Sequence, residues 1–492
     1  MKSSDYQQAL KHCELEPIHL SGAIQPHGVL IKITEQHIIS HVSANVAQLL
    51  QLEPEQLLGQ SVTKFEHLAP AYQAFFATKQ RHQLQAGALK IEQWLDLCWQ
   101  RVDDGVLLEL EINQDRVDFR ELNHNHLARL LHAPSQPSEL AAFHDFVLQA
   151  LYELTGYSRL LIYQFQPDWS GEVVAEKVES GLGTYLGLRY PASDIPEIVR
   201  KLYLKIAMRS IPNRDYQAVP IIAMDDAPID LSQSRLRSVS PLHLEYMTNM
   251  GVMASFSLPI IYQKKLWGLV SGHHHEATAM PATMREQCKD WVRTYNVSLS
   301  SYFNGERLKL MDRMERLADT FLQILLTERD GLSALQNQGE TVMALFDADG
   351  FAAIIDDEYA CVGDTPTPQV LASLKQWLQE QPENWWSTDC LQCVFPEQPA
   401  LLAVASGLLA LRLDIQRLGK LRFFWFRSEQ KQQITWAGNP NKPILEKAGA
   451  MMLSPRRSFE KWVEVKSGYA RPWQERDHIL ATKMRAHLLR ML

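Results

Sequence analysis

Residues 185–214 hold the densest group of side chains that could do chemistry. Within this group, Pro191 and Pro196 bracket Asp194. Proline fixes its own φ angle and disfavours helix in the residue before it, so the backbone at 192–195 is expected to be extended or turned. The pattern therefore predicts a carboxylate held on a stiff loop. The alternative is an ordinary turn aspartate without a further role.

The stretch after this loop alternates apolar and basic side chains. The apolar members are Ile198, Leu202, Leu204 and Ile206, and the basic ones are Arg200 and Arg209. An amphipathic helix with this pattern would present Tyr203 and Arg209 to a cavity. The alternative is a surface helix whose basic residues are solvated.

A second group of polar residues occupies 234–275. His243 lies three residues before Tyr246, which places both on one face of a helix. Ser255 and Ser257 share one face of a strand, because side chains alternate along a strand.

Two arginines are candidates to bind the acid groups of a buried ligand. Such groups need paired cations and hydroxyl donors. Arg209 and Arg237 could supply the cations, and the two strand serines could supply the hydroxyls.

Signatures of metal binding and catalysis are weak. In the run 273–275, only His273 and His275 could share one side of a strand, and no acidic or thiol ligands are regularly spaced around them. The sequence has no phosphate-binding P-loop, GxSxG elbow or HExxH motif. Cys390 and Cys393 form a lone CxxC pair, to which we assign no role. We expect neither a metal site nor catalysis.

Composition and charge narrow the class of protein. The chain has 492 residues, 46% hydrophobic and 22% charged, which is typical of a globular protein with about three domains. A net charge of −8 argues against nucleic acid as a partner. The sequence lacks a signal-peptide pattern and a membrane-spanning apolar run, and six cysteines are too few for a disulfide framework. These features predict a cytoplasmic protein in a reducing compartment, with no membrane partner.

Three α+β regions are expected to position the polar groups. The first, up to about residue 130, has strands at 28–33 and 106–112. A turn-rich linker then ends in Ser138, which is expected to cap a helix. The second region has strands at 159–164, 172–179, 253–262 and 265–273, the last two joined by a turn at 263–264. The third has strands at 342–346, 352–355, 408–414 and 420–427.

A long helix is predicted from residue 284 to about 327, where no proline occurs. Its seam repeats every seven residues at Phe303, Leu310, Leu317 and Ile324, with Met314 and Phe321 between them. The first half can equally pack on its own domain. For the second half we favour a helix that links two domains and pairs with a partner chain. A final helix at 474–492 has no glycine stop, as though a downstream part were missing.

The chain resembles the photosensory core of a bacteriophytochrome, with PAS, GAF and PHY domains in that order. The resemblance covers essentially the whole chain. It rests on HCELEPIHLSGAIQPHG near the N-terminus, PASDIP at 191–196, SPLHLEYMTNMGV at 240–252, LWGLVSGHHH at 266–275 and PRRSF at 455–459. It implies three α+β sensor domains, each an antiparallel sheet with helices, at 1–130, 131–312 and 313–492.

The resemblance also implies a cofactor. This is biliverdin, a linear tetrapyrrole bound in the GAF domain and joined by a thioether from Cys13 to a vinyl group of ring A. Cys13 is the only cysteine in the N-terminal arm. The plant-type members use a cysteine immediately before the motif histidine, where this chain has Leu242. That departure favours biliverdin over the more reduced plant bilins.

The same resemblance assigns the pocket. The main-chain carbonyl of Asp194 and the side chain of His243 are expected near the pyrrole nitrogens, with Ile195 among the contacts. The propionates are expected to meet Arg209, Arg237, Ser255 and Ser257. The walls around ring D are expected to be Tyr163, Tyr190, Tyr203, Tyr246 and His273.

Light is expected to drive Z-to-E isomerisation between rings C and D, and an arm of the PHY domain, residues 438–473, is expected to respond. Its marked residues are Trp436 at the start and then Arg456, Ser458, Trp462 and Trp473. The resemblance implies that Arg456 pairs with Asp194 in the dark state and that Ser458 replaces it when the arm refolds from hairpin to helix. Residues 459–465 suit both a strand and one helical face.

The function implied is that of a red/far-red photoreceptor without turnover. It would act as a homodimer through its long helices and signal to an output domain absent from this chain. One alternative is the sensory part of a signalling enzyme, a histidine kinase or diguanylate cyclase, whose catalytic module was truncated. Another is a GAF-type sensor of a diffusible ligand such as a cyclic nucleotide or haem.

Overall fold

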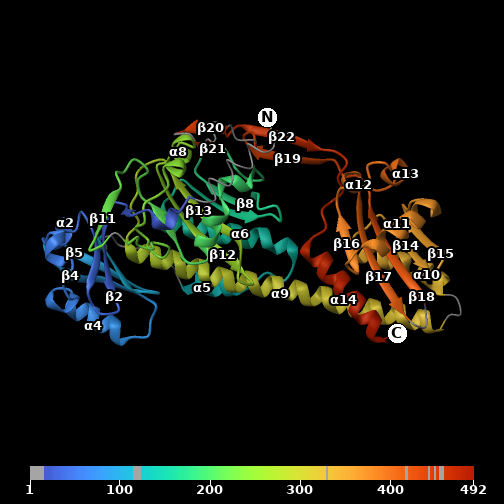
Figure 1. Cartoon of the computed structure of the whole chain (residues 1–492), viewed down its shortest axis with the longest axis horizontal. Coiled ribbons are helices and arrows are strands. Elements are labelled where there is room, and N and C mark those ends of the chain that lie inside the picture. Colours follow the sequence, from blue (N-terminus) through green and yellow to red (C-terminus); the bar gives the residue numbers. More distant parts are fainter. Residues whose placement is uncertain are drawn as a thin grey trace. The chain divides into compact units, whose positions relative to one another are not determined.

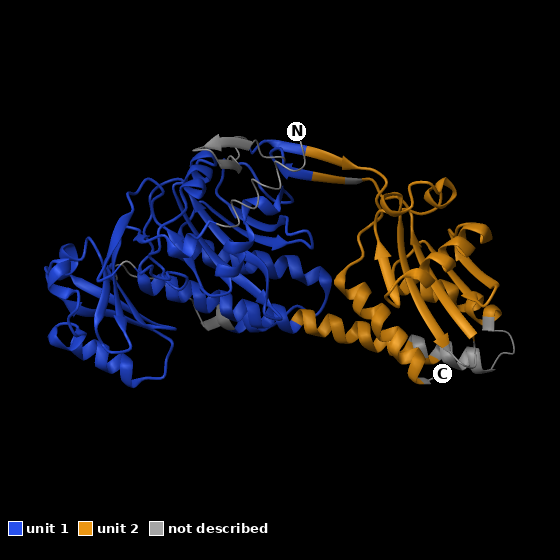
Figure 2. Ribbon diagram, viewed as in Figure 1, with its two compact units in different colours: residues 1–301, 435–462 blue, residues 302–434, 463–492 orange. Residues whose placement is uncertain are grey.

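The computed structural model describes residues 16–114, 124–225, 227–327, 331–415, 419–440, 444–447, 450–453 and 459–491. The chain forms two compact units, Met1–Ser301 with Thr435–Trp462 and Tyr302–Ile434 with Val463–Leu492 (Figure 2). Both units combine helices with mainly antiparallel sheets, so the predicted α+β class is confirmed. Within the described ranges, no helix has the length and apolar character needed to cross a bilayer.

The first sheet of unit 1 has seven strands (Figure 1). In spatial order they are β1 (Ala23–Ile24), β11 (Val219–Ala223), β3 (Ile39–Ser43), β2 (Gly28–Thr34), β6 (Gly105–Ile112), β5 (Trp94–Val102) and β4 (His82–Lys90). Its core packs against α2 (Ala47–Leu50), α3 (Pro54–Leu57) and α4 (Ala69–Ala77). The short helices η1 (Ile18–Leu20), η2 (Val62–Lys64) and α5 (His124–Leu131) complete this region.

The strand β11 joins this sheet from far along the chain. Ile221 pairs with Ser43, and Pro220 pairs with Ala23. The backbone N–H of Gln25 also donates to the carbonyl oxygen of Leu236 at 2.7 Å. The stretch 219–238 therefore ties the first sheet to the second domain, a connection between distant residues that local periodicity does not reveal.

The second sheet of unit 1 carries most of the polar groups singled out above. Its strands, in spatial order, are β10 (Arg209–Ile211), β12 (Ala254–Tyr262), β13 (Lys265–His274), β7 (Arg159–Phe165), β8 (Gly171–Val178), β9 (Arg189–Tyr190), β19 (Gln432–Ala437) and β22 (Lys461–Lys466). The helices around it are α6 (Pro137–Thr155), η3 (Ala192–Asp194), α7 (Glu197–Tyr203) and α8 (Pro241–Asn249). The predicted turn between β12 and β13 is confirmed, with positive φ at Gln263 and Lys264.

The long helix α9 (Ala282–Thr327) matches its prediction. Within unit 2, Met314 is buried in the core and Leu310 packs against the same cluster. These two positions of the seam therefore contact their own domain. The side chains of Leu317 and Ile324 lie outside the described residues.

The sheet of unit 2 has five strands between two layers of helices. In spatial order they are β15 (Glu358–Gly363), β14 (Gly350–Ile355), β18 (Gly419–Arg427), β17 (Gly407–Ile415) and β16 (Trp385–Thr388). One face packs against α10 (Gly331–Leu345) and α14 (Glu475–Met491), and the other against α11 (Pro368–Glu380), α12 (Leu391–Val394) and α13 (Pro399–Leu402). In the arm, β20 (Ile444–Lys447) pairs with β21 (Ala450–Leu453).

One predicted strand and one predicted helix cap are wrong. The strand expected at 342–346 is the end of α10, where Val342 and Leu345, three residues apart, face the core. A short apolar run fits either a strand or a buried helix, and here the helical spacing holds. Ser138 is not an N-cap, because α6 begins at Pro137 with Gln136 at the cap. Proline suits the first helical position since its missing N–H would have no partner there.

Candidate ligand-binding site

The loop that carries Asp194 is a single 3₁₀ turn, η3, between the two prolines. Pro196 then occupies the N-cap position of α7. The turn predicted between the two prolines is therefore present. The hydroxyl of Tyr246 donates a hydrogen bond to Asp194 Oδ2 at 3.3 Å.

The helix α8 presents two aromatic rings on one face. The rings of His243 and Tyr246 stack with centroids 6.1 Å apart, as expected for residues three positions apart. The ring of Phe459, from the arm, meets Tyr246 edge-on at 5.3 Å. Tyr246 therefore contacts both the Asp194 loop and the arm.

Three antiparallel strands form a polar floor. Arg209 of β10 lies opposite Ser257 of β12, and Ser257 lies opposite Ser271 of β13. The Oγ atoms of Ser257 and Ser271 are 3.0 Å apart. Ser255 lies opposite His273 in the same register. Arg209 thus lies on a strand, which corrects the helix predicted for it, and only Tyr203 lies on α7.

These elements enclose a cavity of about 260 Å³ in unit 1. Every described residue that the sequence assigned to a ligand contact lines it: Tyr163, Tyr190, Asp194, Ile195, Tyr203, Arg209, Arg237, His243, Tyr246, Ser255, Ser257 and His273. The structure therefore brings together groups spread over 111 positions of the chain, from 163 to 273. Cys13 lies outside the described residues, and Glu16 and Ile18 are the nearest lining residues in sequence.

Two arginines give the cavity a positive wall. Arg209 Nη1 donates to the carbonyl oxygen of Arg235 at 3.1 Å, and its Nη2 donates to that of Arg237. Arg237 is 6% exposed, and among the described residues its Nη1 is buried without a hydrogen-bond partner. A buried cationic nitrogen without a partner is costly, so it fits a ligand that brings an anion.

The pKa shifts of these two arginines also favour an anionic ligand. Burial, followed by the positive charge of Arg209, lowers the pKa of Arg237 to about 9. Burial also lowers the pKa of Arg209. Two like charges in a low-dielectric cavity disfavour each other, and an acidic ligand would remove that penalty.

His273 offers a neutral polar group on the wall. Burial, with smaller electrostatic effects of Arg159 and His243, lowers its pKa to about 4. The imidazole is therefore neutral near pH 7. Its Nδ1 is buried and lacks a hydrogen-bond partner within the described part of the chain. The other two histidines of the run contact a different residue, because His274 and His275 both hydrogen-bond the Ser158 hydroxyl, at 2.6 and 2.7 Å.

Tyrosines form the remaining wall. The ring centroids of Tyr163 and Tyr190 are 5.9 Å apart. A Cβ atom on Gly171 would lie 1.7 Å from Tyr163 Cζ, so only glycine lets Tyr163 occupy this place. Burial raises the pKa of Tyr203, while a hydrogen bond with Ser257 acts in the opposite direction.

Some residues of the site were not identified from the sequence. Ser271 lines the cavity, and alternation along β13 two residues before His273 could have identified it. Glu109 lies outside the cavity but holds its wall: it accepts hydrogen bonds from Ser234 Oγ at 2.6 Å, Arg235 Nε at 3.1 Å and the Leu236 N–H at 3.1 Å. Its signal in the sequence is one of two acidic residues, Glu109 and Glu111, in a strand whose other residues are glycine or apolar.

The arm residues fall into two sets. Arg456 and Ser458 lie outside the described residues.

The tryptophans of the arm are described. Trp436 is buried and pairs with Arg189 of β9. Close to it, the Gly438 N–H donates to the Glu460 carbonyl oxygen at 2.8 Å. Trp462 is on β22, 37% exposed, and Trp473 is buried in unit 2. Residues 461–466 are a strand here, one of the two conformations that the sequence allowed.

Comparison with known proteins adds independent findings. Family models match at residues 13–113 (PAS fold), 140–292 (GAF domain) and 314–492 (phytochrome region). Cyanobacterial phytochrome B of Nostoc sp. is 34% identical, over 98% of this chain and 66% of that protein. A bacteriophytochrome of Xanthomonas campestris is 33% identical, over 94% of this chain and 75% of that protein. The chain thus spans about two thirds of the first relative's length.

A solved structure agrees over the whole length. The photosensory core module of the Stigmatella aurantiaca phytochrome superposes with a TM-score of 0.82 and 31% sequence identity, over 97% of each chain. The similarity therefore covers the fold as well as the sequence.

Proposed function

This chain belongs to the phytochrome family, and we propose that it is the bilin-binding photosensory part of a red/far-red photoreceptor. The observation that supports this most directly is the cavity of unit 1, which combines buried arginines, hydroxyl groups and tyrosine walls. A linear tetrapyrrole has two acid groups and an extended apolar framework, which match these two kinds of wall. Relatives named phytochrome and bacteriophytochrome support the same assignment.

We propose biliverdin as the bilin and Cys13 as its attachment point. Glu16 and Ile18 line the cavity, and Cys13 precedes Glu16 by three residues. Three residues of chain span at most about 10 Å, so Cys13 is within reach of a group at the cavity edge. Leu242, immediately before His243, has no thiol and so offers no alternative attachment point for the bilin.

We assign different roles to the residues of the cavity. Arg209 and Arg237 hold the acid groups, with Ser255 and Ser257 as hydroxyl donors. His243 and the Asp194 carbonyl oxygen accept hydrogen bonds from the ring N–H groups, directly or through water, and the tyrosines pack around the last ring. When bound, the bilin supplies light absorption and the Z-to-E isomerisation between rings C and D.

Tyr246 provides the physical route to the arm. Its hydroxyl binds Asp194, and its ring contacts Phe459. A change in the space beside Tyr246 therefore alters both contacts at once. We propose that this change releases the arm, 438–473, with Arg456 and Ser458 as the exchanging partners of Asp194.

The remaining assignments concern the parent protein. We propose domain boundaries near 130 and 312, a cytoplasmic location, and a homodimer through the long helices, for which the exposed Leu308 of α9 is an available contact. An output domain in the parent protein would receive the signal, and the chain itself would have no turnover. The alternative, the sensory part of a histidine kinase or diguanylate cyclase, differs only in the module attached beyond Leu492, and the parent gene sequence decides it.

Co-expression of the chain with a source of biliverdin tests the proposal. We expect a coloured protein, a zinc-fluorescent band in a denaturing gel, and reversible absorption changes under red and far-red light. A Cys13→Ala variant should lose the fluorescent band, whereas Cys361→Ala should keep it. A protein that stays colourless, or whose spectrum is unchanged by light, contradicts the proposal and favours a sensor of a diffusible ligand.

A further inference from the structure

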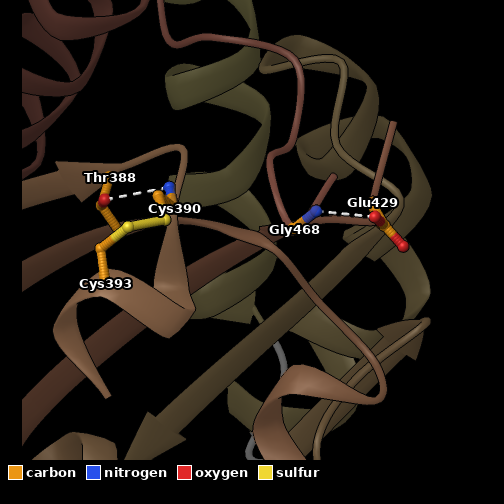
Figure 3. The surroundings of a disulfide bond; sticks show 5 residues. All are labelled: Thr388, Cys390, Cys393, Glu429 and Gly468. Carbon is orange, nitrogen blue, oxygen red and sulfur yellow. Dashed lines mark hydrogen bonds between the residues drawn. A yellow bond between two sulfur atoms is a disulfide. The ribbon is translucent and has the colours of Figure 1, made fainter. Parts of the chain in front are cut away.

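A disulfide joins Cys390 and Cys393 in unit 2, where the sequence analysis assigned no pairing (Figure 3). Cys390 is 4% exposed and sits at the start of α12, whereas Cys393 is exposed. The proposed light response does not use this bond. We propose that it is a thiol–disulfide exchange site. We also propose that opening the bond weakens the contacts that hold residues 468–473, the C-terminal end of the arm.

The loop that leads into the disulfide binds the end of the arm. Trp473 Nε1 donates to the Thr388 carbonyl oxygen at 2.9 Å, and the Ala470 N–H donates to the Asp389 carbonyl oxygen at 2.8 Å. The Cys390 N–H donates to Thr388 Oγ1 at 3.1 Å (Figure 3). The position of the first cysteine is therefore coupled to the two backbone carbonyls that hold residues 470–473.

The same loop reaches the terminal helix. Ser387 Oγ and His478 Nε2, on α14, are 3.0 Å apart. Arg427 holds the intervening chain, donating to the carbonyl oxygens of Arg471 and Pro472 at 3.0 Å each. Residues 387–390 thus touch both the end of the arm and the first turn of the helix that follows it.

A tight contact connects the disulfide ring itself to the arm. Gln392 lies between the two cysteines, and a Cβ atom on Gly468 would lie 2.8 Å from its side chain. Gly468 has φ of +79°, a conformation that favours glycine, and its N–H donates to Glu429 Oε1 at 2.7 Å (Figure 3). A rearrangement of the Cys390–Cys393 segment would therefore press on or release this turn.

The chemistry requires a dithiol reductant. Its thiolate attacks the sulfur of the exposed Cys393, the S–S bond breaks, and Cys390 leaves as a thiolate that takes up a proton. The second thiol of the reductant then attacks the mixed disulfide, which frees Cys393 as a thiol and leaves the reductant as a disulfide. Two electrons pass from the reductant to the protein. Without the bond, the ordering of residues 390–393 depends on local contacts alone.

The test uses the full chain, with and without biliverdin, before and after treatment with dithiothreitol. We expect two further thiols to react with a maleimide after treatment. We also expect hydrogen exchange at the Ala470 amide to accelerate about tenfold, the effect of weakening one hydrogen bond. In the biliverdin-bound chain, the light-induced state should revert in the dark at a rate changed several-fold. This last readout rests on the proposed function.

Variants separate the site from general effects of reductant. A Cys390→Ser/Cys393→Ser chain should exchange as rapidly as the reduced protein and stop responding to dithiothreitol. A Cys361→Ser chain, which removes a free thiol of the same unit, should respond as the parent does. If the serine chain does not fold, the reduced parent protein still provides the comparison.

Two outcomes overturn the proposal. One is a bond that resists dithiothreitol in the folded chain. The other is a reduced protein whose exchange at Ala470 is unchanged. If the chain does not photoconvert, the photoreceptor function fails, but the labelling and exchange experiments still decide the redox site in the chain without biliverdin.

Discussion

At the scale of single residues, Arg237 carries a buried positive charge. An anionic ligand would offset the free-energy cost of burying that charge. Burial and the neighbouring Arg209 lower the pKa of Arg237 to about 9. We expect Arg237→Gln to weaken biliverdin binding about tenfold, because one charge-assisted hydrogen bond is lost while repulsion from Arg209 is relieved. The same relief should raise the thermal midpoint of the ligand-free chain. Titration by absorbance and thermal unfolding measure the two effects.

A matched control for this prediction is Lys205→Gln, which removes an exposed positive charge outside the cavity lining. Its affinity for biliverdin should equal that of the parent. If Arg237→Gln instead binds biliverdin normally and unfolds at lower temperature, Arg237 has a structural role only.

The buried imidazole of His144 should make the stability of the folded chain depend on pH. It is 4% exposed on α6, its Nδ1 lies 2.8 Å from the hydroxyl of Tyr295 on α9, and burial lowers its pKa to about 4. The unfolded chain takes up this proton near pH 6.5, and the folded chain does so only near pH 4. The contribution to stability is therefore present above pH 6.5 and is lost as the pH falls toward 4, by on the order of 3 kcal/mol.

The measurement is the thermal midpoint of the ligand-free chain from pH 7 to pH 4. His144→Gln should show a shallower decline than the parent over this range, because its side chain does not titrate. His132→Gln, at an exposed position, should follow the parent curve. Parallel curves for the parent and His144→Gln would assign the acid sensitivity to other groups.

At the scale of elements, β6 positions the arginine wall without touching the cavity. Glu109 accepts from the backbone N–H of Leu236 and from the side chains of Ser234 and Arg235. We expect Glu109→Gln to weaken biliverdin binding about tenfold, since an amide NH₂ group replaces one carboxylate oxygen and the charge that Arg235 meets is lost. Asp103→Asn, an exposed carboxylate before β6, is the control.

A double-mutant cycle distinguishes positioning from general destabilisation. If Glu109 acts through the placement of Arg237, the combined variant should bind only slightly more weakly than Arg237→Gln alone. Additive losses would indicate that Glu109 stabilises the fold and does not place Arg237.

The elements themselves were largely predictable, because strands such as 28–33 and the helix α9 have strong local periodicity. The error at 342–346 arose where an apolar run is too short to distinguish helix from strand. The insertion of β11 into the first sheet depends on pairing between distant residues, as in Ile221 with Ser43. Local patterns contain no information about such pairing.

The candidate site was also predictable from the sequence only in part. Motif residues such as Asp194 and His243 were identifiable by type and spacing, but their convergence on one cavity follows from tertiary structure. Glu109 was missed because it acts from another domain through hydrogen bonds to 234–236. The disulfide was missed because a lone CxxC does not reveal whether its sulfurs are joined.

At the scale of the whole molecule, the cavity and the arm are separable in sequence. Among the residues that the structure describes, those that line the cavity lie between Glu16 and His273. The arm adds Phe459 against Tyr246 and Trp436 beside Arg189. If binding and switching are separate properties, removing the arm should affect one and spare the other.

We therefore expect a chain that ends at Ser301 to bind biliverdin covalently but to hold its light-induced state poorly, with reversion in the dark at least several-fold faster than in the full chain. Phe459→Ala in the full chain should shift reversion in the same direction and by less, because it removes one aromatic contact of about 1 kcal/mol. Time-resolved absorbance after a red pulse measures both. Equal reversion in the truncated and full chains would mean that the arm does not stabilise the switched state, and loss of pigment from the truncated chain would mean that the cavity depends on residues beyond 301.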